Sequence, residues 1–389
     1  METIERHSLT KAFQAFANEP PSSIYFSPGR VNLIGEHTDY NNGYVFPAAL
    51  TMGTYLAISF RPDQSIQMKS ENFPESYTHL TSSLSYSSEH SWSNYPKGVM
   101  RAFQELGYTL PGMNLLYYGT LPNGAGLSSS ASIEMVTAFF LNDVLDAGLS
   151  RTQLAQLCQK VENDYIGVNS GIMDQYAVGL GKEAHALFIH TGTLEHELVP
   201  LALGSYSIVI TNTNKKRGLA DSKYNERRSE CEQGLHILQK EGYPLDSLSD
   251  LTTATWAQAK TVVTNNSLKK RVNHVVTENS RVRQAVTFLK AHDLKSLGAC
   301  MNESHQSLAD DYEVTGYELD LLYSIQKEQQ GCIGTRMTGA GFGGCTVSLV
   351  HQEYIDAFKE NVSFLYEQKT SIKPDFYVSL AGDGVKKLD

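Results

Sequence analysis

The hydrophobic pattern in the first half of the chain predicts two consecutive helices. Apolar side chains three or four positions apart form the buried face of a helix. Between Ser129 and Leu145 this face comprises Ile133, Val136, Phe140 and Val144. After Ser150 it comprises Leu154, Leu157, Val161 and Tyr165. Ser150 and Gln153 have the spacing of a capping box, and the second helix should end near Gly167.

Short apolar runs separated by turn residues predict strands before and after these helices. A turn is expected at Asn41-Asn42-Gly43, because Asn and Gly tolerate a positive φ angle. The expected strands cover several pieces of 24–60, then 113–118, 206–211, 346–350 and 376–380. Residues 215–330 and 354–368 have mainly helical patterns, and the polar stretch 81–88 is expected to be a surface loop.

The change from a β-rich first half to a helix-rich second half predicts two domains. The length of 389 residues agrees with this, since domains usually contain about 100–200 residues. We place the boundary between an N-terminal domain of residues 1–200 and a C-terminal domain of residues 201–389. No Pro/Gly linker marks this position.

Composition and charge narrow the possible partners and the compartment. The formal net charge is −10, which argues against general affinity for nucleic acid or an anionic membrane. No run of about 18 apolar residues and no signal peptide is evident. The five cysteines are widely spaced and form no CxxC pair, so we expect no disulfide framework, no thiolate zinc site and a cytoplasmic location. No obligate protein partner is indicated.

The segment at residues 121–132 (LPNGAGLSSSAS) lies between an expected strand and an expected helix. Small residues allow backbone N–H groups to approach an anion, and the helix N-terminus adds partial positive charge. The serine hydroxyls suit phosphate or hydrated Mg²⁺. The segment is not a Walker A loop, because it lacks the GxxxxGK[ST] pattern. The alternative is a Gly-rich turn with a serine N-cap.

A second polar segment covers residues 27–40 (SPGRVNLIGEHTDY). Arg30, Glu36, His37 and Asp39 lie within ten residues of one another. Carboxylates and an imidazole suit a ligand with many hydroxyl groups, which both donate and accept hydrogen bonds. The alternative is an ordinary solvated loop.

Three further segments carry candidate chemistry. Glu162 borders the apolar face of its helix, and Asp174 follows a glycine-containing turn, where a carboxylate is a candidate base or a helix cap. Residues 336–345 (RMTGAGFGGC) contain four glycines in six positions, which indicates close backbone approach or a tight loop. Residues 220–228 surround Tyr224 with charges of both signs, as on an exposed helix face.

Together these segments resemble the GHMP small-molecule kinases and, within them, the galactokinase family. The similar blocks are 29–40 (GRVNLIGEHTDY), 124–132 (GAGLSSSAS), 171–175 (GIMDQ), 223–228 (KYNERR), 274–279 (HVVTEN) and 338–344 (TGAGFGG). They occur in family order over nearly the whole chain. Val168 and Ser170 depart mildly from the family pattern, where other small residues are frequent.

The resemblance implies ATP-dependent phosphorylation of the C1 hydroxyl of α-D-galactose, giving galactose 1-phosphate and ADP. By similarity, Asp174 is the catalytic base and Arg30 is its charge partner. The implied sugar-binding residues are Glu36, His37, Thr38, Asp39 and Tyr224. The alternatives are another GHMP sugar kinase, such as one for N-acetylgalactosamine, and a non-catalytic galactose- and ATP-sensing regulator.

The resemblance also implies a nucleotide site, a metal and a fold. The implied nucleotide-binding residues are Ser70, Gly124, Ala125, Gly126, Leu127, Ser128, Ser129 and Ser130. Ser130 and Glu162 would hold Mg²⁺, and ATP would be the co-substrate. The implied fold class is α+β with two domains: an N-terminal domain like ribosomal protein S5 and a ferredoxin-like C-terminal domain, with the active site in the cleft between them.

Overall fold

The computed structural model describes residues 2–122, 125–215 and 220–388. A six-stranded sheet forms the centre of the first half, with strand order β13-β1-β3-β6-β4-β5. Its strands are β1 (Ser23–Asn32), β3 (Pro47–Arg61), β4 (Ser65–Ser70), β5 (Ser76–Leu80), β6 (Gly112–Gly119) and β13 (Lys386–Leu388). Because β13 pairs with β1, the end of the chain returns to the sheet of the first half. The division at residues 200 and 201 stays a prediction.

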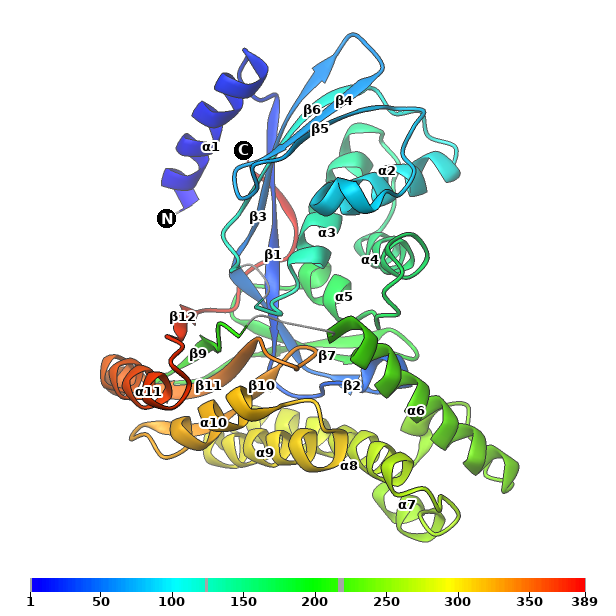
Figure 1. The fold of residues 1–389 in the computed structure, drawn as a ribbon, viewed down its shortest axis with the longest axis vertical. Coiled ribbons are helices and arrows are strands. Elements are labelled where there is room, and N and C mark those ends of the chain that lie inside the picture. Colours follow the sequence, from blue (N-terminus) through cyan, green and yellow to red (C-terminus); the bar gives the residue numbers. More distant parts are fainter. Residues whose placement is uncertain (1, 123–124, 216–219, 389) are drawn as a thin grey trace.

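Helices cover both faces of this sheet (Figure 1). One face carries α2 (Asn94–Glu105), α3 (Ser129–Val144), α4 (Arg151–Lys160) and α5 (Met173–Leu180), and the other carries α1 (Glu2–Ala17). Side chains alternate across a strand, so Tyr25 of β1 packs with Phe140 of α3, whereas Phe26 belongs to the core under α1. The predicted helix pair and the Ser150–Gln153 capping box are confirmed. After Lys160 the helix widens into a π-helical turn, Val161–Ile166, and Gly167 caps it.

A four-stranded sheet of order β10-β11-β9-β12 forms the second half. Its strands are β9 (Tyr206–Asn212), β10 (Cys332–Thr338), β11 (Cys345–His351) and β12 (Asp375–Ser379). The core on one face joins it to α8 (Asn266–Lys290) and α9 (Leu294–Ser307), and the core on the other joins it to α10 (Tyr317–Gln326) and α11 (Ile355–Thr370). The strands and the helix expected at the end of the chain are confirmed.

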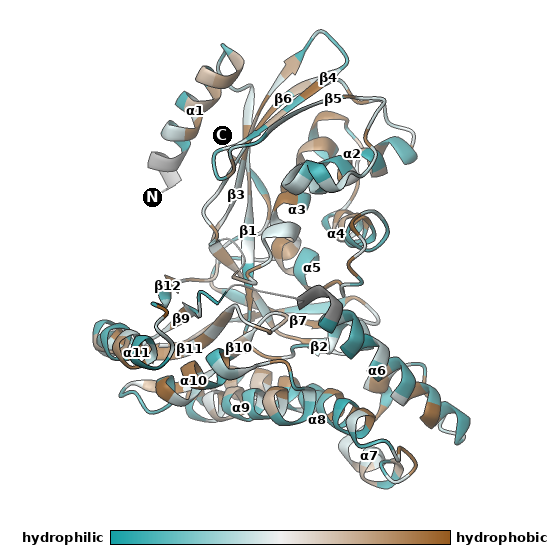
Figure 2. Cartoon of the chain, viewed as in Figure 1, coloured by the Kyte–Doolittle hydropathy of each residue, from teal (hydrophilic) through white to brown (hydrophobic). Residues whose placement is uncertain are grey.

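Two smaller groups of elements complete the fold. A three-stranded sheet contains β2 (Tyr44–Val45), β7 (His185–His190) and β8 (Glu195–Pro200). The helices α6 (Ala220–Lys240) and α7 (Thr253–Ala259) lie at the edge of the second half. Figure 2 shows that the coloured part of α6 is mainly hydrophilic. None of the helices in the described residues combines the length and the apolar character needed to cross a bilayer.

Candidate active site

An ion pair between Arg30 and Asp174 forms the centre of the site. The guanidinium binds the carboxylate through two hydrogen bonds, Nε to Oδ1 at 2.8 Å and Nη2 to Oδ2 at 2.9 Å. Its third nitrogen, Nη1, donates to the carbonyl of Gly126 at 2.6 Å. Arg30 follows a register shift in β1, and such bulges redirect side chains. Its side chain is 4% exposed and that of Asp174 is 28% exposed, so the carboxylate faces an accessible space.

The second half of the chain holds Glu36 in place. Arg336 of β10 forms an ion pair with its carboxylate at 2.5 Å, and the backbone N–H of Gly339 donates to Oε1 at 2.9 Å. Burial still raises the pKa of Glu36. The next residue, His37, has a φ of 63°, and its Nε2 lies 3.1 Å from the carbonyl of Ala340. Burial, with the nearby His274, lowers the pKa of His37 to about 3, so its imidazole is neutral.

Asp39 lies against the turn that precedes α5. Its carboxylate accepts backbone N–H groups from Tyr40 and Met173. A side chain on Gly171 would overlap this carboxylate, so the turn needs glycine there. Burial, then the nearby Asp174, raises the pKa of Asp39 to about 6. Gly171 also donates its backbone N–H to the phenol of Tyr224, whose burial keeps it neutral by raising its pKa well above 10.

These groups line one cavity of about 140 Å³. Seven of the residues singled out by the sequence meet there: Arg30, Glu36, His37, Asp39, Glu162, Asp174 and Tyr224. Thr38 is buried beside the cavity but does not line it. Its hydroxyl donates to the carbonyls of Gly35 and Tyr44, at 2.8 and 2.7 Å, so the structure gives Thr38 a role in shaping the loop.

Glu162 faces the cavity from the π-helical turn. Its Oε2 accepts hydrogen bonds from Ser170 Oγ at 2.7 Å and Gln175 Nε2 at 2.8 Å, and Ser130 also bonds to the carboxylate. No Lys or Arg in the described residues forms an ion pair with it, and burial raises its pKa. A carboxylate and a hydroxyl without a protein cation fit Mg²⁺, which usually takes one or two carboxylates and completes its shell with water and substrate phosphates.

The predicted nucleotide loop contributes mainly backbone. Gly124 lies outside the described residues. Ala125 and Leu127 are buried in the core, so their side chains are not available to a ligand, and the carbonyl of Leu127 accepts the N–H of Arg30 at 3.2 Å. Ser128 precedes α3 with a φ of 61°, and its buried hydroxyl has no hydrogen-bond partner among the described residues.

Ser129 and Ser130 line a second cavity of about 150 Å³, together with the predicted Ser70. The sequence did not predict five other residues that line this cavity: Asn72, Phe73, Trp92, Tyr95 and Tyr117. Aromatic rings beside a helix N-terminus can stack on a nucleobase. The cluster of aromatic residues at 92–95 was the available signal. Because Ser130 bonds to Glu162, the two cavities meet at the candidate metal site.

Comparison with known proteins gives a consistent result along the chain. Residues 11–60 match the galactokinase galactose-binding signature, residues 94–182 the N-terminal domain of GHMP kinases, and residues 285–368 their C-terminal domain. The galactokinase of Halalkalibacterium halodurans is 52% identical over 100% of this chain and 99% of its own length. The chain belongs to the galactokinase family. The Fusobacterium nucleatum galactokinase is 49% identical over 94% of both chains.

Solved structures agree with the two-domain α+β fold of this galactokinase family member. The Lactococcus lactis galactokinase complexed with galactose matches with a TM-score of 0.95 and 42% identity, over 98% of this chain and 99% of that one. The Methanococcus jannaschii mevalonate kinase, at 16% identity, shares the fold with a TM-score of 0.64. The expected GHMP kinase architecture is therefore confirmed.

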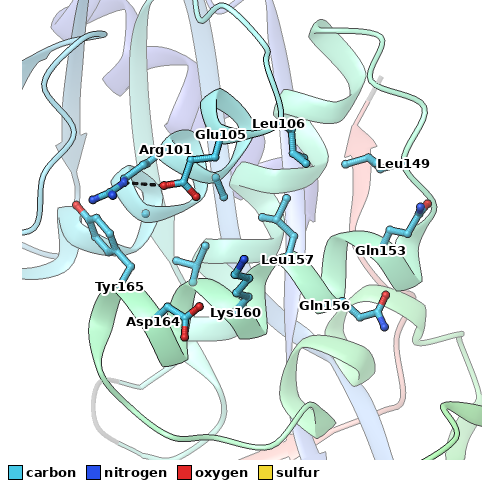
Figure 3. Close-up of a pocket in the computed structure, with 13 residues that line it drawn as sticks. Arg101, Glu105, Leu106, Leu149, Gln153, Gln156, Leu157, Lys160, Asp164 and Tyr165 are labelled. Carbon is cyan, nitrogen blue, oxygen red and sulfur yellow. Dashed lines mark hydrogen bonds and ion pairs between the residues drawn. The ribbon is translucent and has the colours of Figure 1, made fainter.

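A groove of about 540 Å³, which is larger than either of these two cavities, lies between α2, α4 and the π-helical turn (Figure 3). None of the residues predicted for the site lines it. Its polar groups, such as the Arg101–Glu105 pair, are exposed to solvent. The predicted chemistry is found instead in the two smaller cavities.

We predict that Asp39→Asn stabilises the folded protein at pH 8. The pKa of Asp39 is about 6 when folded and about 4 when unfolded, so folding stability is lost as the pH rises through this window. Asn imitates the neutral form, and the gain at pH 8 should reach roughly 3 kcal/mol at most. Urea unfolding at pH 8 and pH 5 tests this. An equal effect at both pH values would contradict the raised pKa.

Proposed function

We propose that this protein transfers the γ-phosphoryl group of ATP to the C1 hydroxyl of α-D-galactose, giving galactose 1-phosphate and ADP. The observation that supports this best is the contact between Arg30 and Asp174 in a polar cavity adjoining a second, aromatic cavity. The first cavity suits a sugar and the second suits a nucleotide. Family membership favours the same reaction.

Recognition of the sugar depends on fixed polar groups. Asp39 and Glu36 can accept hydrogen bonds from sugar hydroxyls, while the neutral phenol of Tyr224 can donate or accept one. Each group is already held by backbone or side-chain contacts, which lowers the ordering cost when the sugar binds. The imidazole ring of His37 would contact the sugar with its edge, next to the carbonyl of Ala340.

Asp174 would act as the base. It accepts the proton of the C1 hydroxyl while the oxygen of that hydroxyl bonds to the γ-phosphorus and the bond from that phosphorus to the β-phosphate oxygen breaks. Arg30 holds the carboxylate of Asp174 through two hydrogen bonds and faces the charge spread over the transferring group. Phosphoryl transfer depends mainly on such positioning and electrostatics.

Ser130 and Glu162 would hold Mg²⁺ between the cavities. The ion would neutralise charge on the phosphate oxygens when bound. Ser170 and Gln175 orient Glu162 for this role through the hydrogen bonds described above. The backbone of 124–130 would surround the phosphates, and Ser70, Trp92 and Tyr95 would face the nucleoside.

We also propose a cytoplasmic location. All five cysteines are free thiols, and four of them are buried. Free thiols persist in reducing compartments. No protein partner is needed for the reaction as proposed.

A side-by-side assay tests the proposed function. Purified protein is incubated with ATP and with galactose, N-acetylgalactosamine or glucose, and ADP and sugar phosphate are measured. Of the three sugars, we expect only galactose to give rapid ADP release. ³¹P NMR of the product should show the phosphate on C1. Preferential turnover of N-acetylgalactosamine would favour the alternative kinase, and binding of galactose and ATP without ADP release would favour the sensor.

Asp174→Asn should lower kcat by about 10²–10⁴-fold, because proton removal is lost while the side-chain shape remains. General-base catalysis contributes about 10²–10⁴-fold. Galactose binding, measured by calorimetry, should change little. If kcat decreased by less than tenfold, Asp174 would not be the base.

Glu162→Gln should weaken Mg²⁺ binding at the site, raising the Mg²⁺ concentration needed for half-maximal rate by about tenfold or more. The amide keeps the hydrogen bonds of Glu162 but removes its charge. Binding of Mn²⁺ in the presence of a non-hydrolysable ATP analogue, followed by electron paramagnetic resonance, provides a second measurement. Identical metal titrations for both proteins would exclude Glu162 as a ligand.

A further inference from the structure

Lys97 is buried in α2, two residues after Tyr95, which lines the second cavity. Its side chain is 0% exposed. The ammonium group donates to the carbonyl of Ser85 at 2.8 Å and to Nδ1 of His90 at 2.5 Å. No carboxylate in the described residues lies within ion-pair distance of it. Both acceptors belong to the segment that leads into Trp92.

A buried ammonium group is costly unless its donors are used. Burial lowers the pKa of Lys97 to about 8. An apolar side chain would fill this position without that cost. The lysine therefore provides something that packing alone does not, namely two directional N–H donors on one atom.

The hydrogen bond also defines the state of His90. Because the ammonium can only donate, Nδ1 of His90 accepts and its proton is on Nε2. The His90 ring lies 4.8 Å from that of His79 and 5.7 Å from that of Tyr77, and Tyr77 packs edge-on against Trp92 at 5.9 Å. Lys97 is thus connected to Trp92 through a continuous set of packed rings.

The segment itself needs an external support. The turn η2 (Ser88–Ser93) contains Ser91 with φ 41° and ψ −128°, a conformation that a serine rarely adopts. Asn94 supports it by donating to the carbonyl of Ser87 at 2.7 Å. Lys97 supplies the second support, one turn further along α2. Together they hold Trp92 between Tyr77 and Tyr117, at the wall of the cavity.

We propose that Lys97 is a positioning residue for the nucleotide side of the active site. It fixes residues 85–92 on α2 and thereby presents Trp92 to the nucleoside. The inference rests on the proposed function, because it takes the aromatic cavity as the nucleotide site. It assigns no contact between Lys97 and any ligand.

Tryptophan fluorescence provides a direct test. The chain has two tryptophans, and Trp256 lies in α7, away from the cavity. In a Trp256→Phe background the emission therefore reports on Trp92. A non-hydrolysable ATP analogue should quench this emission in the parent protein. Without a response, the nucleotide assignment of the cavity and the role of Lys97 both fail.

Lys97→Met keeps the apolar stem and removes the ammonium. We expect about a tenfold rise in the KM for ATP and in the Kd of the analogue, with easier quenching of Trp92 by acrylamide. The KM for galactose and kcat at saturating ATP should stay within twofold. Kinetics are also measured without the Trp256→Phe change. Arg101→Met is the matched control, because Arg101 is on the same helix with its guanidinium at the separate groove (Figure 3), and it should change none of these values.

Two His90 variants separate positioning from general stability. The Asn side-chain oxygen can accept from Lys97, so His90→Asn should preserve the KM for ATP, whereas His90→Phe should raise it as Lys97→Met does. The double variant Lys97→Met with His90→Phe should be no worse than either change alone, as coupled residues behave. An unchanged KM for ATP in Lys97→Met, an equal rise in the KM for galactose, or additive effects would overturn the proposal.

Discussion

The site depends on a buried guanidinium whose charge and donors are satisfied by two other segments of the chain. Arg30 is almost fully buried, so its charge needs a carboxylate and its remaining donor needs an oxygen. Asp174, 144 residues away, supplies the first, and the carbonyl of Gly126 supplies the second. One side chain therefore sets the positions of β1, the start of α5 and the loop before α3. In this fold the burial of Arg30 therefore requires all three to lie together.

The C-terminal half is joined to this centre by close backbone contact as well as by charge. Gly339 has a φ of 84°, and a side chain on it would lie 2.8 Å from the carbonyl of Gly126. The two glycine-rich loops, distant in sequence, therefore touch. Arg336 and the Gly339 N–H hold Glu36 from the same side. This approach requires Gly339, and the positive φ angles of Gly341, Gly343 and Gly344 favour glycine at the other positions.

The sequence allowed much of the fold and the chemistry to be predicted, because helix periodicity, capping and the motif segments are local signals. The Arg30–Asp174 contact followed from resemblance, since no local pattern reveals a pair so far apart. The pattern did not reveal Arg336 or Trp92, whose roles depend on tertiary contacts. The stretch 81–88 was predicted to be a surface loop. The structure confirms a loop there that is mostly exposed, and its Ser85 carbonyl additionally accepts a hydrogen bond from the buried Lys97.

The buried negative charge of the site explains why so many hydrogen bonds and ion pairs hold its side chains in place. Asp39, Glu162 and Glu36 are buried close to Asp174, and burial raises the pKa of each of the three. Arg30 and Arg336 offset only part of this negative charge. A folded chain keeps such a cluster only where surrounding contacts fix it, and the backbone N–H groups of Met173, Tyr40 and Gly339 do so here. Burying these carboxylates lowers the stability of the folded protein. In return, the site has hydrogen-bond acceptors that are oriented before a ligand binds, which electrostatic catalysis requires.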